Sequence, residues 1–153
     1  GIVFQRFEFN DIPSILVMPE NRFAPVVLMS HFDVVDGPDS LFSPWEKNGC
    51  LYGRGSIDDK YAVALSLVLL KNHVERLNAL GKSQNALPFG MLLTGDEEIG
   101  GANGAQKILH EFKTDFCIAL DLSACVGELR TRKNFVIVYS LSDTFLELLT
   151  EVG

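Results

Sequence analysis

The sequence predicts a three-layer α/β sandwich, in which helices cover both faces of a mostly parallel central sheet. Two observations support this fold class. Short runs of branched and apolar residues, which are typical of strands buried on both faces, recur along the chain. Helical patterns separate several of these runs, and such alternation indicates crossover connections between parallel strands.

Residues 26–29 form the clearest buried strand, because a compact apolar run follows Pro25 and ends just before Ser30 and His31. Further strands are expected, in chain order, at residues 2–9, 14–18, 88–94, 115–120, 126–129 and 135–139. We expect the first two of these to pair antiparallel through a turn near Asn10.

The clearest helix is predicted over residues 58–80, because a wide apolar face runs along it and Gly81 stands in the C-terminal cap position. A second helix is expected at residues 102–112, and a third at 143–152. His73 and His110 fall within helices among polar neighbours, so we expect both at the surface.

The composition is that of one folded domain. The chain has 153 residues, of which 47% are hydrophobic, and 13 basic against 20 acidic residues give a net charge of −7. Without a strong basic cluster, nucleic acid is excluded as a main partner. The longest apolar stretch, residues 62–70, is about half the ~20 residues that a membrane-spanning helix needs, so no membrane partner is expected.

Three cysteines, Cys50, Cys117 and Cys125, are odd in number and lack CxxC spacing. This pattern argues against both a disulfide framework and a cysteine zinc site, and we expect mostly buried, reduced thiols. No secretion signal is visible, so a cytoplasmic location is expected.

Acidic residues gather where predicted strands end. The candidate site residues are His31, Asp33, Asp58, Asp59, Asp96, Glu97, Glu98 and Asp121. Ligands of open α/β sheets bind outside the carboxyl ends of the strands. Carboxylates crowded there would raise one another's pKa unless a cation lay among them, so the pattern predicts a metal centre.

One imidazole with several carboxylates and no thiolate suits Zn, with Co or Mn as alternatives. More than four candidate ligands suggest two divalent ions that share a bridging carboxylate. Two such ions activate a water and polarise the carbonyl that it attacks, while an unligated carboxylate takes the proton. The neighbours Glu97 and Glu98 supply one ligand and one base.

Four segments carry a resemblance to a known family: HFDVV (31–35), LYGRGSIDDK (51–60), TGDEEIGG (94–101) and ALDLS (119–123). In order and spacing they resemble the dinuclear zinc peptidases and deacylases. That family includes glutamate carboxypeptidase, aminoacylase, acetylornithine deacetylase, succinyl-diaminopimelate desuccinylase and carnosinase. The resemblance implies a zinc-dependent hydrolase of peptide or N-acyl amide bonds, of carboxypeptidase, dipeptidase or amino-acid deacylase type, acting on small peptides or N-acyl amino acids.

The resemblance also implies roles for individual residues. The implied metal ligands are His31, Asp58, Glu98 and Asp121. Asp58 would bridge the two ions, and its peptide bond to Asp59 is expected to be cis. Asp33 would hold the imidazole of His31, and Glu97 would serve as the general base and later as the acid. Asp59 is also a candidate cap of the long helix.

Some of the family pattern is missing from this sequence. Tyr61 replaces the glycine that usually follows the DDK motif, and no histidine follows His110 to supply the fifth ligand. A lid or dimerisation domain is also missing, so residues 1–153 are expected to form a single, partial catalytic domain. We expect little or no turnover from this isolated chain. The apolar surface left uncovered would favour homo-oligomers.

Arg54 and Lys60 belong to the matched motif, and we expect them to fix the loop and balance charge. Two alternatives stay open. One is an aminopeptidase of a related clan with the same ligand order, although the GRGSIDDK segment favours the first family. The other is a truncated, non-catalytic module that binds metal weakly or serves in protein interactions.

Overall fold

A computed structural model describes residues 1–121, 130–132 and 135–137 of the chain. The strands are β1 (Gln5–Phe9), β2 (Ile12–Val17), β3 (Val26–His31), β4 (Trp45–Lys47), β5 (Cys50–Tyr52), β6 (Phe89–Thr94), β7 (Phe116–Ala119), β8 (Arg130–Arg132) and β9 (Phe135–Ile137). The helices are α1 (Lys60–Ala79), α2 (Ala105–Ile108) and the 3-10 turns η1 (Asp39–Phe42), η2 (Gln84–Ala86) and η3 (Glu97–Ile99).

The main sheet has the strand order β1-β2-β6-β3-β7-β9-β8. Its centre is parallel: β3 pairs with β6 and β7, and β7 pairs with β9, all in the same direction. Antiparallel pairs join β1 to β2, β2 to β6 and β8 to β9 toward the edges. The predicted α/β class is confirmed, with its parallel strands in the middle of a mixed sheet.

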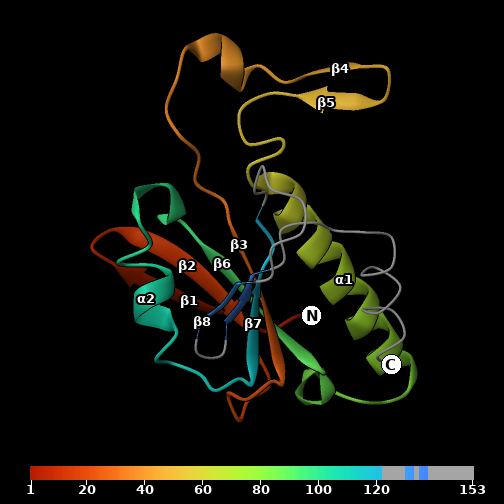
Figure 1. Ribbon diagram of the computed structural model, residues 1–153. Helices are drawn as coiled ribbons and strands as arrows, with labels where there is room; N and C mark the ends of the chain where they lie inside the picture. The colour runs from red at the N-terminus through yellow and green to blue at the C-terminus, as the bar shows by residue number, and fades with distance from the viewer. Residues whose placement is uncertain (122–129, 133–134, 138–153) are drawn as a thin grey trace.

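Helices α1 and α2 lie on opposite faces of the main sheet (Figure 1), and successive residues of a strand point to opposite faces. On one face, Leu28 of β3 and Met91 of β6 pack into a core cluster with Leu69 of α1. On the other face, Val27 of β3 packs with Ile108 of α2. Since Leu28 and Val27 are adjacent and both 0% exposed, β3 is buried on both sides, as its continuous apolar run predicts.

His73 is buried, so its predicted surface position is wrong. Only 9% of it is exposed, and its ring meets Phe89 of β6 edge-on at a centroid distance of 5.1 Å. The reason is helical spacing, because Ser66, Leu69 and Leu70 are also buried and complete an i, i+3, i+4, i+7 stripe with His73. His110 is exposed, as predicted.

Two elements differ from the prediction. Helix α2 covers only Ala105–Ile108 rather than residues 102–112, because turns built on glycines occupy the preceding residues. Strands β4 and β5 form an unpredicted hairpin in which Trp45 pairs with Tyr52, and the two rings stack at 4.1 Å. Together with η1, this hairpin projects from the body as a lobe, residues 36–57, which we call the hairpin lobe (Figure 1).

The expected strand at residues 126–129 and the expected helix at residues 143–152 lie outside the described residues. Of the expected strand at 135–139, the structure shows β9, paired with β8. Within the part of the chain that the structure describes, no helix is both long and apolar enough to span a membrane.

Candidate metal centre

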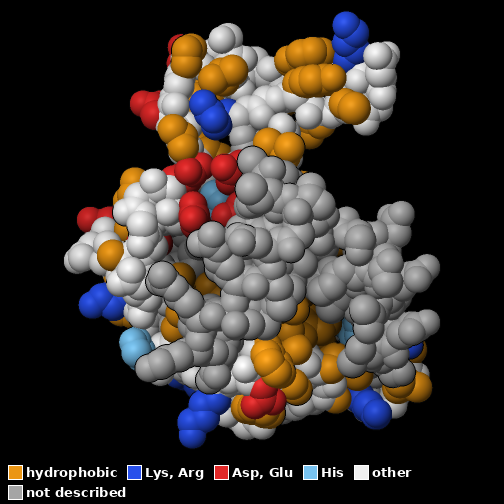
Figure 2. All heavy atoms as spheres, viewed as in Figure 1, with side chains coloured by type: hydrophobic (Ala, Val, Ile, Leu, Met, Phe, Trp, Pro, Cys, Tyr) orange, Lys and Arg blue, Asp and Glu red, His pale blue; other side chains and the backbone are white. Residues whose placement is uncertain are grey.

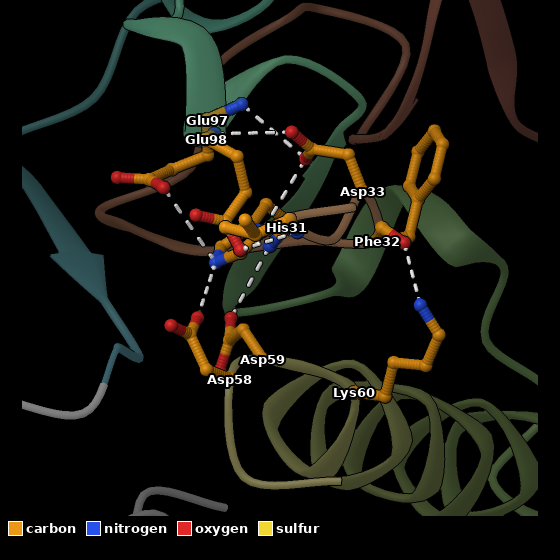
Figure 3. A network of polar contacts seen from close by, with 9 residues as sticks. His31, Phe32, Asp33, Asp58, Asp59, Lys60, Glu97 and Glu98 are labelled. Atoms are coloured by element: carbon orange, nitrogen blue, oxygen red, sulfur yellow. Dashed lines mark hydrogen bonds and ion pairs between the residues drawn. The ribbon is translucent and has the colours of Figure 1, made fainter. Parts of the chain in front are cut away.

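Three neighbouring strands and one helix deliver the candidate site residues to a single edge of the sheet (Figure 3). His31 ends β3, Glu97 and Glu98 form η3 directly after β6, and Asp121 follows β7. Because β3 lies between β6 and β7, the carboxyl ends of these strands converge. Asp58 and Asp59 join them from the loop that enters α1.

The His31 imidazole stands at the centre of this cluster and is 2% exposed. Its Nε2 lies 3.0 Å from Oδ1 of Asp58 and 3.8 Å from Oε2 of Glu97. Its Nδ1 lies 3.3 Å from Oδ1 of Asp33. The ring is therefore held between a carboxylate on its Nδ1 side and two carboxylates on its Nε2 side.

One nitrogen of His31 and one oxygen each of Asp58 and Asp121 all lie within 4.8 Å of one another. Imidazole and carboxylate donors at this spacing suit Zn²⁺ and related divalent ions. Figure 2 shows acidic side chains around a histidine in a hollow beneath the hairpin lobe. The donor set present thus fits the metal that the sequence pattern predicts.

Asp33 links His31 to the turn that carries the two glutamates. Its carboxylate accepts hydrogen bonds from the backbone N–H of Glu97 (3.3 Å) and of Glu98 (3.0 Å). Glu98 in turn accepts a bond from the backbone N–H of Val35 at 3.2 Å, and it stands outside the group of three donors. Asp33 therefore also holds the turn η3 in place, a role that the sequence did not predict.

Asp59 is fully buried, and its Oδ2 accepts a hydrogen bond from the backbone N–H of His31 at 3.2 Å. It occupies the N-cap position of α1, but its side chain makes no capping bond, so the predicted capping role is wrong. Burial raises the pKa of Asp59 to about 7. The peptide bond between Asp58 and Asp59 is cis, as the resemblance implied.

Asp96 is a second buried acid to which sequence reasoning gave no individual role. It is 1% exposed, and its Oδ2 accepts bonds from the backbone N–H groups of Asn103 (2.7 Å) and Gly104 (3.0 Å). Its backbone carbonyl accepts a further bond from the N–H of Gly101 at 2.7 Å. Asp96 thereby closes the loop that begins with Glu97 and Glu98. In the sequence, the only indication that Asp96 belongs to the site is its position directly before Glu97 and Glu98.

Opposing influences act on the site's titratable groups. Burial lowers the pKa of His31, but the negative charges of Asp59, Glu97, Asp33 and Asp58 outweigh it, and the net pKa is raised. Burial raises the pKa of Glu97, with further increases from Asp121, Glu98 and Asp58 and an opposing decrease from His31. Both shifts reflect negative charge crowded into a partly dry site.

Lys60 fixes the loop, as expected, because its Nζ donates to the backbone oxygen of Phe32 at 2.7 Å, between His31 and Asp33. Gly55 permits this close approach. Its φ is +82°, and a Cβ there would lie 2.8 Å from Val34 and 3.2 Å from the Lys60 side chain. The loop before α1 is thus held tightly against the loop after β3.

The fold and the donor set define an α/β domain with a histidine–carboxylate metal centre at the carboxyl edge of its sheet. Comparison with known families makes this more specific. The chain belongs to peptidase family M20/M25/M40, whose family model matches residues 27–135. This confirms the family resemblance and places the chain among the metallopeptidases and amidohydrolases.

Individual relatives cover different parts of the chain. The N-fatty-acyl-amino acid synthase/hydrolase of Bos taurus is 39% identical over 94 residues, covering 55% of this chain and 17% of that protein. A succinyl-diaminopimelate desuccinylase of Coxiella burnetii is 28% identical over 135 residues, covering 81% of this chain and 35% of that protein. The chain thus spans about a third or less of the length of these relatives.

Among solved structures, human carnosine dipeptidase 1 is similar to this chain with a TM-score of 0.49 and 21% sequence identity. The match covers 73% of this chain and 25% of that protein.

Proposed function

We propose that this chain carries the metal-binding part of a hydrolase that cleaves the amide bond of an N-acyl amino acid or a small peptide. The observation that carries the proposal is the convergence of His31, Asp58 and Asp121, with donor atoms within 4.8 Å of one another. Family membership supports it, as do the two relatives, one named an N-fatty-acyl-amino acid synthase/hydrolase and the other a desuccinylase.

His31, Asp58 and Asp121 would hold one divalent ion such as zinc, and Glu98 would contribute to holding a second. Bound there, divalent ions supply an activated water and a polarised carbonyl. For this role Glu98 would have to leave its hydrogen bond with Val35, and side-chain rotamer changes of this kind are common on binding.

Glu97 is the base in this proposal. Its carboxylate lies 3.8 Å from Nε2 of His31, at the mouth of the donor group, and half of its side chain is exposed. It takes a proton from the attacking water, whose oxygen bonds to the amide carbon. When the carbon–nitrogen bond breaks, Glu97 returns the proton to the leaving nitrogen, so the products are a carboxylic acid and an amine.

Asp33 and Asp59 are positioning residues. Asp33 faces Nδ1 of His31 and holds the backbone of Glu97 and Glu98, while Asp59 holds the backbone of His31. The backbones of the base and of the predicted second ligand are therefore hydrogen-bonded to the same carboxylate that lies 3.3 Å from Nδ1 of the imidazole. A site of this kind depends on such support to keep its donors in register.

The test is hydrolysis of N-acetyl amino acids, N-acyl amino acids and dipeptides by the zinc-loaded chain, followed by mass spectrometry of the released amine. We expect slow release at most, in line with the little or no turnover expected of the isolated chain. The release should disappear on chelation and in Glu97→Gln, which keeps the shape of the side chain but removes the base. Equal release by Glu97→Gln, or release that survives chelation, would contradict the proposed function.

A further inference from the structure

We propose that two copies of this chain associate through the outer edge of strand β1, pairing antiparallel about Phe7 so that their main sheets join into one. The partner in this inference is a second copy of the chain. The inference does not depend on the proposed hydrolase function, because none of the candidate metal ligands lies on β1.

Strand β1 has one free edge. It stands at the end of the strand order β1-β2-β6-β3-β7-β9-β8, so β2 covers only one of its two edges. In the part of the chain that the structure describes, no strand pairs with the other edge. The unpaired N–H and C=O groups of such an edge are a template for a strand from another chain.

The turn between β1 and β2 fixes the direction of the backbone groups of β1. Asn10 and Asp11 form a two-residue turn with positive φ at both positions, 51° and 62°. In such hairpins the two flanking residues, here Phe9 and Ile12, are hydrogen-bonded to each other. Bonded and non-bonded pairs alternate along an antiparallel ladder, so every second residue counted back from Phe9 bonds to β2. The residues between them turn their N–H and C=O groups away from β2.

These outward groups belong to Arg6 and Glu8, and two further observations agree with this assignment. Glu8 stands opposite Pro13, which has no N–H to donate. Val3 lies in phase with the inward residues, and both of its backbone groups bond to the Gln84 side chain, the N–H at 2.8 Å and the C=O at 2.7 Å. The same amide also donates to the backbone just beyond β2, so it lies on the β2 side of the strand.

The charge pattern selects one register for a second copy. Arg6 and Glu8 are exposed, lie on one face of β1 and form an ion pair with each other. When two copies pair about Phe7, Arg6 of each copy lies opposite Glu8 of the other, and the two residues exchange both N–H···O bonds. A shift by two residues places Arg6 opposite Arg6 or Glu8 opposite Glu8, and like charges directly opposite each other are destabilising. The edge is therefore complementary to itself in the register about Phe7.

Phe7 lies on the axis of this register, at a non-hydrogen-bonded position, where facing side chains come closest. Its ring is partly buried in the cluster that contains Val27, and it stacks on Phe9 at a centroid distance of 6.3 Å. Two Phe7 rings thus face each other across the axis, and cross-strand aromatic pairs stabilise a sheet. Because one strand of each copy takes part, the contact is smaller than the roughly 1,200 Å² of standard complexes, and we expect a weak, reversible dimer.

Sedimentation equilibrium at chain concentrations up to about 1 mM measures this association, for which we expect a Kd on the order of 10⁻⁴ M. Glu8→Arg and Arg6→Glu each place like charges opposite each other and should raise the Kd at least about tenfold. The double variant with both substitutions restores opposite charges and should return the Kd to within about threefold of the unaltered chain. The two single substitutions change the net charge in opposite directions, so a loss common to both excludes a general charge effect.

Glu46→Arg is the matched control, because Glu46 is an exposed glutamate on another strand, β4, and the substitution makes the same charge change as Glu8→Arg. It should leave the Kd unchanged. Thermal melting shows that each variant is folded.

Backbone amide exchange, followed by NMR, shows which edge is used. The amide protons of Arg6 and Glu8 should exchange freely in dilute solution and at least about threefold more slowly at 1 mM. The amide proton of Phe7 bonds to β2 and should be protected at both concentrations.

A chain that stays monomeric at 1 mM would overturn the inference, as would a dimer that Glu8→Arg and Arg6→Glu leave intact or a double variant as weak as the single ones. Leu51 in the hairpin lobe is 65% exposed and tests a rival contact. A dimer that Leu51→Ser dissociates and Glu8→Arg does not would overturn the β1 contact in favour of the lobe. None of these measurements involves hydrolysis, so the proposed function is tested separately.

Discussion

Replacing Asp96 with alanine should destabilise the whole domain and loosen the candidate base. The Asp96 carboxylate is 1% exposed and accepts two backbone N–H groups, those of Asn103 and Gly104. Truncation leaves both donors without this acceptor. Each lost bond to a charged acceptor costs about 1–2 kcal/mol, so Asp96→Ala should lose about 2–4 kcal/mol of unfolding free energy.

Urea unfolding followed by circular dichroism measures this loss, and the melting temperature should fall by about 5–15 °C. Asp96→Asn keeps a carbonyl oxygen for the same two donors and should lose about half as much. Asp115→Ala is the matched control, because Asp115 is an exposed acid at the start of the next strand. Equal stability of Asp96→Ala and Asp115→Ala would refute the reasoning.

Three further outcomes are expected. Glu97→Gln should still bind zinc, as measured by elemental analysis, but its rate of hydrolysis should fall at least about a hundredfold, since general-base catalysis contributes at least that much. Loss of zinc from this variant would instead make Glu97 a ligand. Iodoacetamide at pH 8 should label exposed Cys50 but not Cys117, because burial raises the pKa of the Cys117 thiol to about 11. Peptide mass spectrometry maps the labelled sites, and labelling of Cys117 in the folded chain would disprove its burial. Leu28→Ala should lose about 2–5 kcal/mol of unfolding free energy, since Leu28 is 0% exposed between two layers, and a loss below about 1 kcal/mol in urea would contradict the packing.

The order of the main elements could be predicted because the pattern that specifies them is local. β3 and β6 are continuous apolar runs, and α1 carries a long apolar stripe that ends at a glycine with φ +67°. His73 was misjudged because its sequence neighbours Lys71 and Glu75 are polar. Its helical neighbours Ser66, Leu69 and Leu70 are buried, and position on the helix face decides burial.

The hairpin lobe could have been predicted from one dipeptide. Asn48 and Gly49 both have positive φ, 53° and 75°, and an Asn-Gly pair between short strands is a strong hairpin signal. The strands themselves, Trp45–Lys47 and Cys50–Tyr52, are too short to show a period. The turn residues, rather than the strands, therefore carried the information.

At the site, the motif resemblance predicted His31, Asp58 and Asp121 as ligands, and the structure brings these three residues together. The supporting roles of Asp59 and Asp96 could not be predicted, because the sequence does not distinguish a solvated carboxylate from a buried one that accepts backbone N–H groups. Asp59 and Asp96 became recognisable as supports only through their burial and their bonds to His31, Asn103 and Gly104.

The most direct test of the account is zinc titration of the chelated chain by calorimetry, comparing the unaltered chain with Asp58→Ala and with Asp39→Ala, an exposed acid in the lobe. Metal binding to a preformed set of imidazole and carboxylate donors depends on each donor. We predict stoichiometric zinc binding that Asp58→Ala weakens at least tenfold and Asp39→Ala leaves unchanged. Zinc binding of equal strength in all three chains, or in none, would contradict a metal centre built on His31, Asp58 and Asp121.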